Sequence, residues 1–145
     1  MRILLSLALV ALAACSSTQA GDGDPELSDV VGDWNSTLQA RANSGVTGTA
    51  RAQAVAAATA ITVNISGATP NAHHPWHVHT GTCATGGPVW GAATAYTPLH
   101  VGANGSATAS ASVGQALNEE QRYHVNVHRS ETEMNVIISC GDLRN

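Results

Sequence analysis

The stretch Pro75-Trp76-His77-Val78-His79-Thr80-Gly81-Thr82-Cys83 alternates polar and apolar residues around its two histidines. In an extended strand, side chains two residues apart emerge on the same face, roughly 7 Å apart along the backbone. His77 and His79 would therefore share a face, near enough for both imidazoles to reach one metal ion, while Trp76 and Val78 would point into a core. The stretch predicts a strand that carries part of a metal site.

A second segment, Tyr123-His124-Val125-Asn126-Val127-His128, repeats the pattern with polar residues at even positions and apolar residues at odd ones. His124 and His128 would share a face but lie about 13 Å apart along the strand. Only one of them could therefore join His77 and His79 at a single ion. The spacing alone leaves open which of the two it is.

Several other short segments alternate in the same way between turn signals rich in Gly, Asn and Pro. We expect strands over residues 34–41, 46–55, 60–66, 106–113, 122–128 and 134–140. The segment 84–99 is rich in Gly, Pro and Ala and is expected to be a long loop. Short strands separated by turns are typical of an all-β, antiparallel sandwich or barrel.

The length and composition of the chain exclude some classes of function. The chain of 145 residues is long enough for one domain with appendages. It has no Lys and a formal net charge of −4, so it lacks the basic surface that binding to nucleic acid requires. The sequence also contains no recognisable nucleophile triad and no phosphate-binding loop, so hydrolytic chemistry has no candidate residues.

The N-terminus has the features of an export signal. Residues 1–14 combine Arg2 with an apolar run too short to span a bilayer. Leu12-Ala13-Ala14-Cys15 resembles a bacterial lipobox, which predicts that Cys15 is lipidated and anchors the chain to the membrane of the cell envelope, with outer-membrane sorting expected from Ser16. The alternative is an ordinary secretory signal with an incidental cysteine. Residues 15–33 are expected to be a flexible tether, which leaves 34–145 as the folded domain.

With Cys15 assigned to lipidation, two cysteines remain. The periplasm permits disulfides, and one remaining pair leaves one intramolecular connectivity. We therefore predict a disulfide between Cys83 and Cys140. Closing a loop of that length contributes about 4 kcal/mol on the chain-entropy model.

Histidine is the residue type best placed to carry chemistry. The seven histidines fall into three groups, namely His73, His74, His77 and His79, then His100, then His124 and His128. A site built from imidazoles without thiolates favours copper or zinc. A surface pair bonded to the backbone is the alternative for His77 and His79. His73 and His74 are expected in a loop, as solvated side chains or as a feature that captures copper.

Several motifs, in order, resemble the copper/zinc superoxide dismutase family. Residues 60–71 followed by Trp76-His77-Val78-His79 resemble the family's strand, turn and His-Val-His copper strand. Val127-His128 resembles its later Val-His strand, and Ser139-Cys140-Gly141 resembles the Ala-Cys-Gly of its C-terminal disulfide cysteine. His100-Val101-Gly102 resembles the His-Val-Gly before the family's next strand. The resemblance covers the chain from Trp34 to Asp142 and implies a Greek-key β-sandwich or barrel.

The resemblance also implies a ligand set. It selects His128, rather than His124, as the partner of His77 and His79 at a copper ion. It further offers His100 as a fourth ligand. Copper bound in this way would oxidise one superoxide and reduce the next.

Two departures from the family pattern bear on the function. Residues 84–99 contain no His and no Asp, and Ala103 stands where the family has an Asp, so no family-like zinc site is expected. Ile137 stands where the family has a substrate-guiding arginine, which weakens the case for fast superoxide turnover.

These observations predict an exported, copper-binding, superoxide dismutase-like lipoprotein, with superoxide as the expected substrate. The alternative is a non-catalytic periplasmic protein that binds, buffers or delivers copper. A third possibility is a metal-free sandwich related to chordin-type domains that acts as a scaffold.

Overall fold

A computed structural model describes residues 30–55 and 57–145. The predicted signal peptide, the lipidated Cys15 and most of the predicted tether lie outside these residues. The described part is all-β and antiparallel, as predicted, with one short 3-10 turn. Its elements are β1 (Val30–Ala40), β2 (Thr47–Val55), β3 (Ala58–Ser66), β4 (His73–His74), β5 (Trp76–Thr80), η2 (Ala93–Ala95), β6 (Leu99–His100), β7 (Ala107–Val113), β8 (Tyr123–His128) and β9 (Ile137–Leu143).

The observed strands differ from the predicted ones at the start of β1, at the end of β9 and in two additional short strands. Strand β1 begins at Val30, within the segment expected to be tether, so the folded region starts before residue 34. Strand β9 continues to Leu143, beyond the expected end at residue 140. The two-residue strands β4 and β6 lie in segments expected to be loops. Strands this short leave no periodic signal in a sequence.

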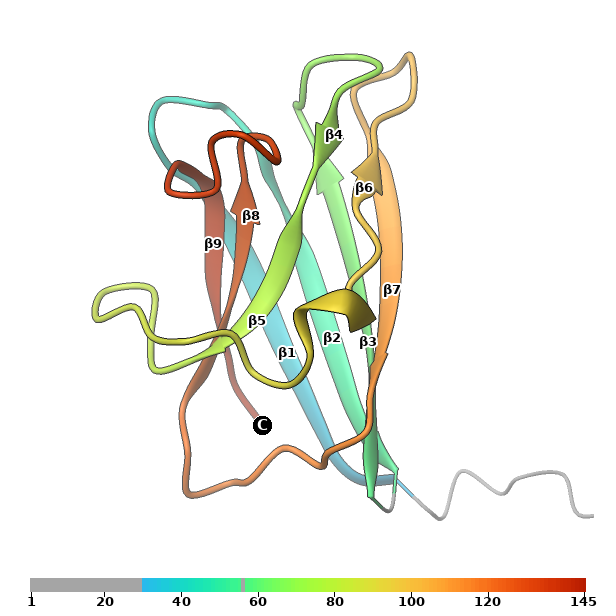
Figure 1. The fold of residues 1–145 in the computed structure, drawn as a ribbon, viewed down its shortest axis with the longest axis vertical. Helices are drawn as coiled ribbons and strands as arrows, with labels where there is room; N and C mark the ends of the chain where they lie inside the picture. Colours follow the sequence, from blue (N-terminus) through green and yellow to red (C-terminus); the bar gives the residue numbers. More distant parts are fainter. Residues whose placement is uncertain (1–29, 56) are drawn as a thin grey trace, which may run out of the picture.

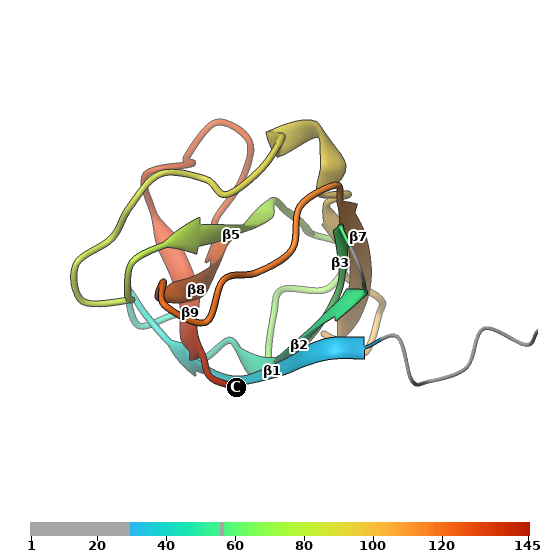
Figure 2. The same ribbon diagram turned by 90° about the horizontal axis from the view of Figure 1, so that it is seen from below.

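Seven strands form one sheet in the order β5-β8-β9-β1-β2-β3-β7, and β4 pairs with β6 separately. Figure 2 shows how this sheet curls, with β1 and β2 joining the wall of β5, β8 and β9 to the wall of β3 and β7. The first and last strands, β1 and β9, pair with each other, and the chain crosses between the two walls from β3 to β5 and again from β7 to β8, as in a Greek key. The architecture is the predicted antiparallel sandwich or barrel.

Strands β5 and β7 are the two edges of the sheet. Residues 81–106, which connect them along the chain, lie between these edges in place of a long strand (Figure 1). The Trp90 N–H donates to the Val78 carbonyl at 2.8 Å, which attaches this segment to β5. Tyr96 forms an isolated bridge with Ala111 of β7, which attaches it to the other edge. The segment expected to be a loop therefore closes the barrel wall.

The core follows the alternation read from the sequence. Ile61, Val63 and Ile65 of β3 are buried, and Trp76 and Val78 of β5 face them from the opposite wall. Burial of this apolar surface stabilises the sheet by about 25 cal/mol per Å². The inward face of β5 is thus fixed by packing, which also fixes the direction of its histidines.

The outer face of β8 is buried as well, since all six residues of the strand are buried. Polar side chains on one face of an antiparallel strand ordinarily meet water. Here two loops, residues 81–92 and 129–136, cover them. The outer face of β5 and β8 is therefore an enclosed polar layer, separate from the apolar core.

The predicted disulfide is confirmed. Cys83 and Cys140 are bonded, with their Cα atoms 6.0 Å apart. The bond ties the 81–92 loop to β9, and the Cys83 N–H donates to Asp142 Oδ1 at 2.7 Å. The cover over the polar layer is thus attached covalently to the sheet.

Within residues 30–55 and 57–145, no helix has the length and apolar character needed to cross a bilayer.

Candidate metal centre

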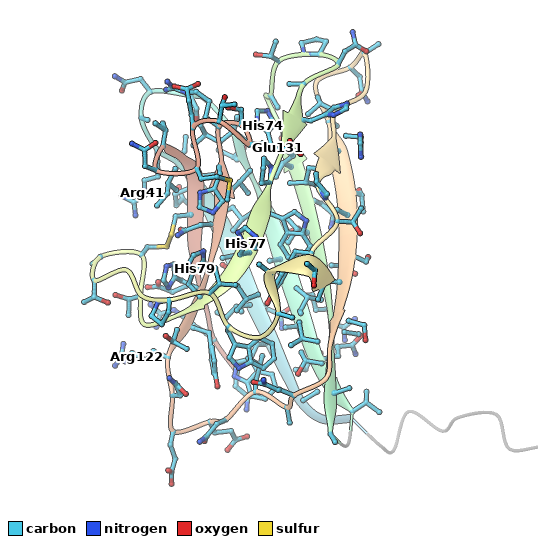
Figure 3. All side chains as sticks on the ribbon, in the orientation of Figure 1. Arg41, His74, His77, His79, Arg122 and Glu131 are labelled. Atoms are coloured by element: carbon cyan, nitrogen blue, oxygen red, sulfur yellow. A yellow bond between two sulfur atoms is a disulfide. The ribbon has the colours of Figure 1, made fainter. Side chains whose placement is uncertain are left out.

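His77, His79 and His128 form a buried group in the polar layer. Each offers a ring nitrogen, and these three atoms lie within 4.8 Å of one another. The three residues are 8%, 8% and 5% exposed. Figure 3 shows His77 and His79 in succession along β5. The predicted convergence of histidines from two distant segments is present, and we call these residues the three-histidine group.

Strand pairing explains why the rings meet. Strand β5 pairs with β8 so that His77 is opposite Asn126 and His79 is opposite His124. His128 lies one step beyond this ladder, where its N–H donates to the Pro75 carbonyl at 2.8 Å. The β8–β9 register shifts between Val127 and His128. The His128 ring centroid lies 5.4 Å from that of His77 and 5.9 Å from that of His79.

Backbone carbonyls determine which nitrogens are free. His79 Nδ1 lies 2.9 Å from the Gly87 carbonyl oxygen, and His128 Nδ1 lies 2.6 Å from that of Met134. A carbonyl can only accept, so Nδ1 carries the proton in both rings and Nε2 keeps its lone pair. His77 Nδ1 faces the same space, 3.4 Å from His128 Nε2.

These nitrogens suit a metal ion. An ion bound at about 2.0 Å by each imidazole holds its ligand nitrogens roughly 3–4 Å apart. The His77 to His128 separation of 3.4 Å meets this requirement, and the other pairs require at most a small closure. His79 Nε2 is buried without any hydrogen-bond partner. Such an orphaned acceptor costs about 1–3 kcal/mol, which metal binding would offset.

The electrostatics favour the ligating form of these rings. Burial, together with the neighbouring His128 and His79, lowers the pKa of His77 to about 4. Burial also lowers the pKa of His128, although its bond to Met134 opposes the change. Neutral imidazole is the form that binds metals. At neutral pH these two rings are therefore ready to ligate.

His124 lies beside the group but does not belong to it. It is 1% exposed, and its ring stacks on His79 with centroids 5.2 Å apart. Burial is the main cause that lowers its pKa. The choice that spacing left open is resolved, since His128 and not His124 joins His77 and His79.

His74 has a structural relation to the group that the sequence did not reveal. It is buried in β4, and its Nδ1 lies 3.2 Å from the His128 carbonyl oxygen and 2.8 Å from that of Arg129. Its ring therefore donates to the backbone that carries His128. The expectation of a solvated loop residue was wrong for His74, because β4 places it against the end of β8.

His100 is not part of the three-histidine group. It lies in β6, which pairs with β4, and its exposed side chain meets His73 rather than the buried rings. The expectation that His100 is a fourth ligand is therefore not supported. Its strand belongs to a separate two-stranded sheet, and that pairing turns the side chain toward solvent.

No family model matches the chain, and no curated protein matches it either. The function of the chain is therefore inferred from the geometry of the three-histidine group.

Proposed function

We propose that this chain is an exported copper-binding lipoprotein of the bacterial cell envelope whose three-histidine group holds one copper ion. The observation that carries the proposal is the buried convergence of three imidazole nitrogens. Two of the rings are fixed by carbonyl partners so that Nε2 points at the shared space. Such partners orient a ligand and raise its basicity.

The donor set favours copper over its competitors. Within the described residues, the group contains no carboxylate and no thiolate, which disfavours magnesium, calcium and iron–sulfur clusters. Imidazole suits both copper and zinc, and for a given nitrogen site copper(II) binds more tightly than zinc. The disulfide is compatible with an oxidising, extracytoplasmic location.

We further propose superoxide as the reaction partner. Copper held by these three histidines would supply one-electron redox chemistry between Cu(II) and Cu(I), by which one superoxide would be oxidised to oxygen and a second, with two protons from water, reduced to hydrogen peroxide. Three histidine ligands would leave a bound ion able to accept a small molecule as a further ligand. The covering loops limit access, because the three side chains are nearly enclosed. These features support a small diatomic substrate better than an organic one.

A specific observation favours the non-catalytic alternative, a protein that binds or delivers copper. Arg129 follows His128 directly, but its exposed guanidinium lies 3.4 Å from the carboxylate of Glu133, whose negative charge opposes its attraction for an anion. Ile137 offers no charge either. Among the described residues, neither position 129 nor position 137 therefore provides an unpaired positive charge, and superoxide would gain little steering from them.

Copper titration of the chain and two variants tests the binding proposal. We expect one tightly bound copper per chain in the wild type and loss of that site in His128→Ala. His124→Gln is the matched control, since His124 is equally buried on the same strand but lies outside the group. Equal copper binding by the wild type and His128→Ala would refute the proposal.

A superoxide assay on the copper-loaded protein separates the two functions. Catalysis predicts disproportionation above that of buffer, lost in His128→Ala. Stoichiometric copper binding with no acceleration would leave the non-catalytic function.

A further inference from the structure

A second pair of histidines lies on the surface, at the β4–β6 ribbon. His73 of β4 is directly opposite His100 of β6. His100 Nδ1 lies 3.2 Å from His73 Nε2, and the ring centroids are 4.2 Å apart. Both side chains are exposed, whereas the other five histidines are buried. This pair is therefore the part of the histidine set that faces solvent.

We propose that His73 and His100 form a second, exposed binding site for a divalent transition-metal ion such as Cu(II). Imidazole nitrogens bind such ions at about 2.0–2.1 Å. Two nitrogens 3.2 Å apart at that bond length subtend an angle of about 100° at the ion, which is suitable for adjacent ligands. One of the two facing nitrogens now carries the proton of their hydrogen bond. When an ion binds, that ring changes tautomer and carries the proton on its other nitrogen. Both facing nitrogens can then bind the ion, and no net proton is lost.

The backbone holds the two ligands in place before an ion binds. The Val101 N–H donates to the Ala72 carbonyl at 2.9 Å, and the Asn71 N–H donates to the Val101 carbonyl at 3.0 Å. These bonds flank the His73–His100 pair on the same ribbon. A pre-organised pair loses little conformational freedom on binding.

The surroundings determine the character of the site. Residues 69–76 and 98–106, which carry the pair, contain no Asp, Glu, Lys or Arg. These segments therefore neither repel a cation nor add a carboxylate ligand. Water would complete the coordination shell, which predicts weaker and more exchangeable binding than at the three-histidine group.

The site is distinct from those already described. His74, the neighbour of His73, points the opposite way and contacts the backbone of His128. The pair also differs from the zinc site of the resembling family, which needs ligands from the segment equivalent to 84–99 and an Asp at the position of Ala103, and this chain has neither. His73 precedes the His-Val-His strand and has no place in that pattern.

Retention of the untagged chain on immobilised Cu(II) tests the proposal. A chelated, bead-bound ion can reach exposed rings but not the enclosed three-histidine group. We expect retention of the wild type and of His77→Ala. We expect His73→Ala, His100→Ala and the double variant to weaken binding equally, each by at least about tenfold, because one ion needs both rings.

Thr62→Ala/Ser110→Ala is the matched control, since Thr62 and Ser110 are another exposed cross-strand pair, with hydroxyl oxygens 3.1 Å apart. It should be retained like the wild type, and thermal melts should show that every variant folds. Lack of retention of the wild type, or undiminished retention of the double variant, would overturn the proposal. So would additive losses in the single variants, which indicate independent rings. Copper binding by the three-histidine group is measured separately and does not affect these outcomes.

Discussion

At the scale of single residues, the metal centre depends on which nitrogen of each ring carries a proton. The sequence placed His77 and His79 on one face, because strand alternation is a local property. It did not identify the carbonyls of Gly87 and Met134, which fix two tautomers. Those carbonyls lie in loops, and their positions depend on the tertiary fold.

His74 offers a direct test of how the backbone near His128 is held. We expect His74→Leu to weaken copper binding by about tenfold, because it removes the donor to the His128 and Arg129 carbonyls. Competition titration with a copper chelator measures this change. His73→Leu, the same change at the exposed neighbour, should leave the buried site unaltered. Equal effects of the two changes would contradict the assigned role.

The low pKa of His77 predicts how the stability of the metal-free protein depends on pH. Because the folded pKa is about 4 and the usual value is 6.5, the unfolded chain binds more protons between these values. The free energy of unfolding should therefore fall as the pH is lowered from 6.5 toward 4, by about 3 kcal/mol from His77 alone. His124 and His128 act in the same direction.

Urea denaturation at pH 7.5, 6 and 5 measures this dependence. In His77→Ala it should be smaller than in the wild type. A free energy of unfolding that is constant from pH 7.5 to 5 would show that these rings are not held neutral by the fold.

At the scale of elements, the long strands were predictable and the covering loops were not. Strands β3, β5 and β8 alternate clearly enough to be read from the sequence. The loops 81–92 and 129–136 carry no periodic pattern, yet they enclose the polar layer. Their course depends on contacts with β5 and β9 that no local pattern encodes.

Gly87 tests the contribution of the 81–92 loop. A Cβ there would overlap the Thr80 carbonyl, so Gly87→Ala must displace the loop and the carbonyl that accepts from His79. We expect weaker copper binding, by about tenfold, with a smaller change in thermal stability. Gly114→Ala is the control, since a Cβ at Gly114 meets nothing within 4 Å. Unchanged copper affinity in Gly87→Ala would show that the loop carbonyl is dispensable.

The contribution of the Cys83–Cys140 disulfide to stability can be tested in the same way. Cys83→Ala/Cys140→Ala should lower the free energy of unfolding by about 4 kcal/mol, because the bond closes a long loop. Denaturant unfolding of the wild type with and without reductant should give the same difference. A loss below about 1 kcal/mol would indicate that the bond constrains the unfolded chain little.

At the scale of the whole molecule, the antiparallel class was predictable from many short alternating strands, whereas the Greek-key order was expected only from the family resemblance. The closure of the barrel was not. The segment between β5 and β7 closes the wall through irregular contacts such as the Tyr96–Ala111 bridge. The prediction that His100 is a fourth ligand was not supported for the same reason. The β4–β6 pairing that places His100 at the surface is a tertiary feature without a sequence signal.

The proposed function depends on His77, His79 and His128 binding one copper ion together. A crystal structure of the copper-loaded chain, with anomalous scattering recorded at the copper edge, would locate that ion. We expect one strong peak about 2.0–2.1 Å from His77 Nδ1, His79 Nε2 and His128 Nε2. A copper-loaded crystal with no peak among these three nitrogens would contradict it.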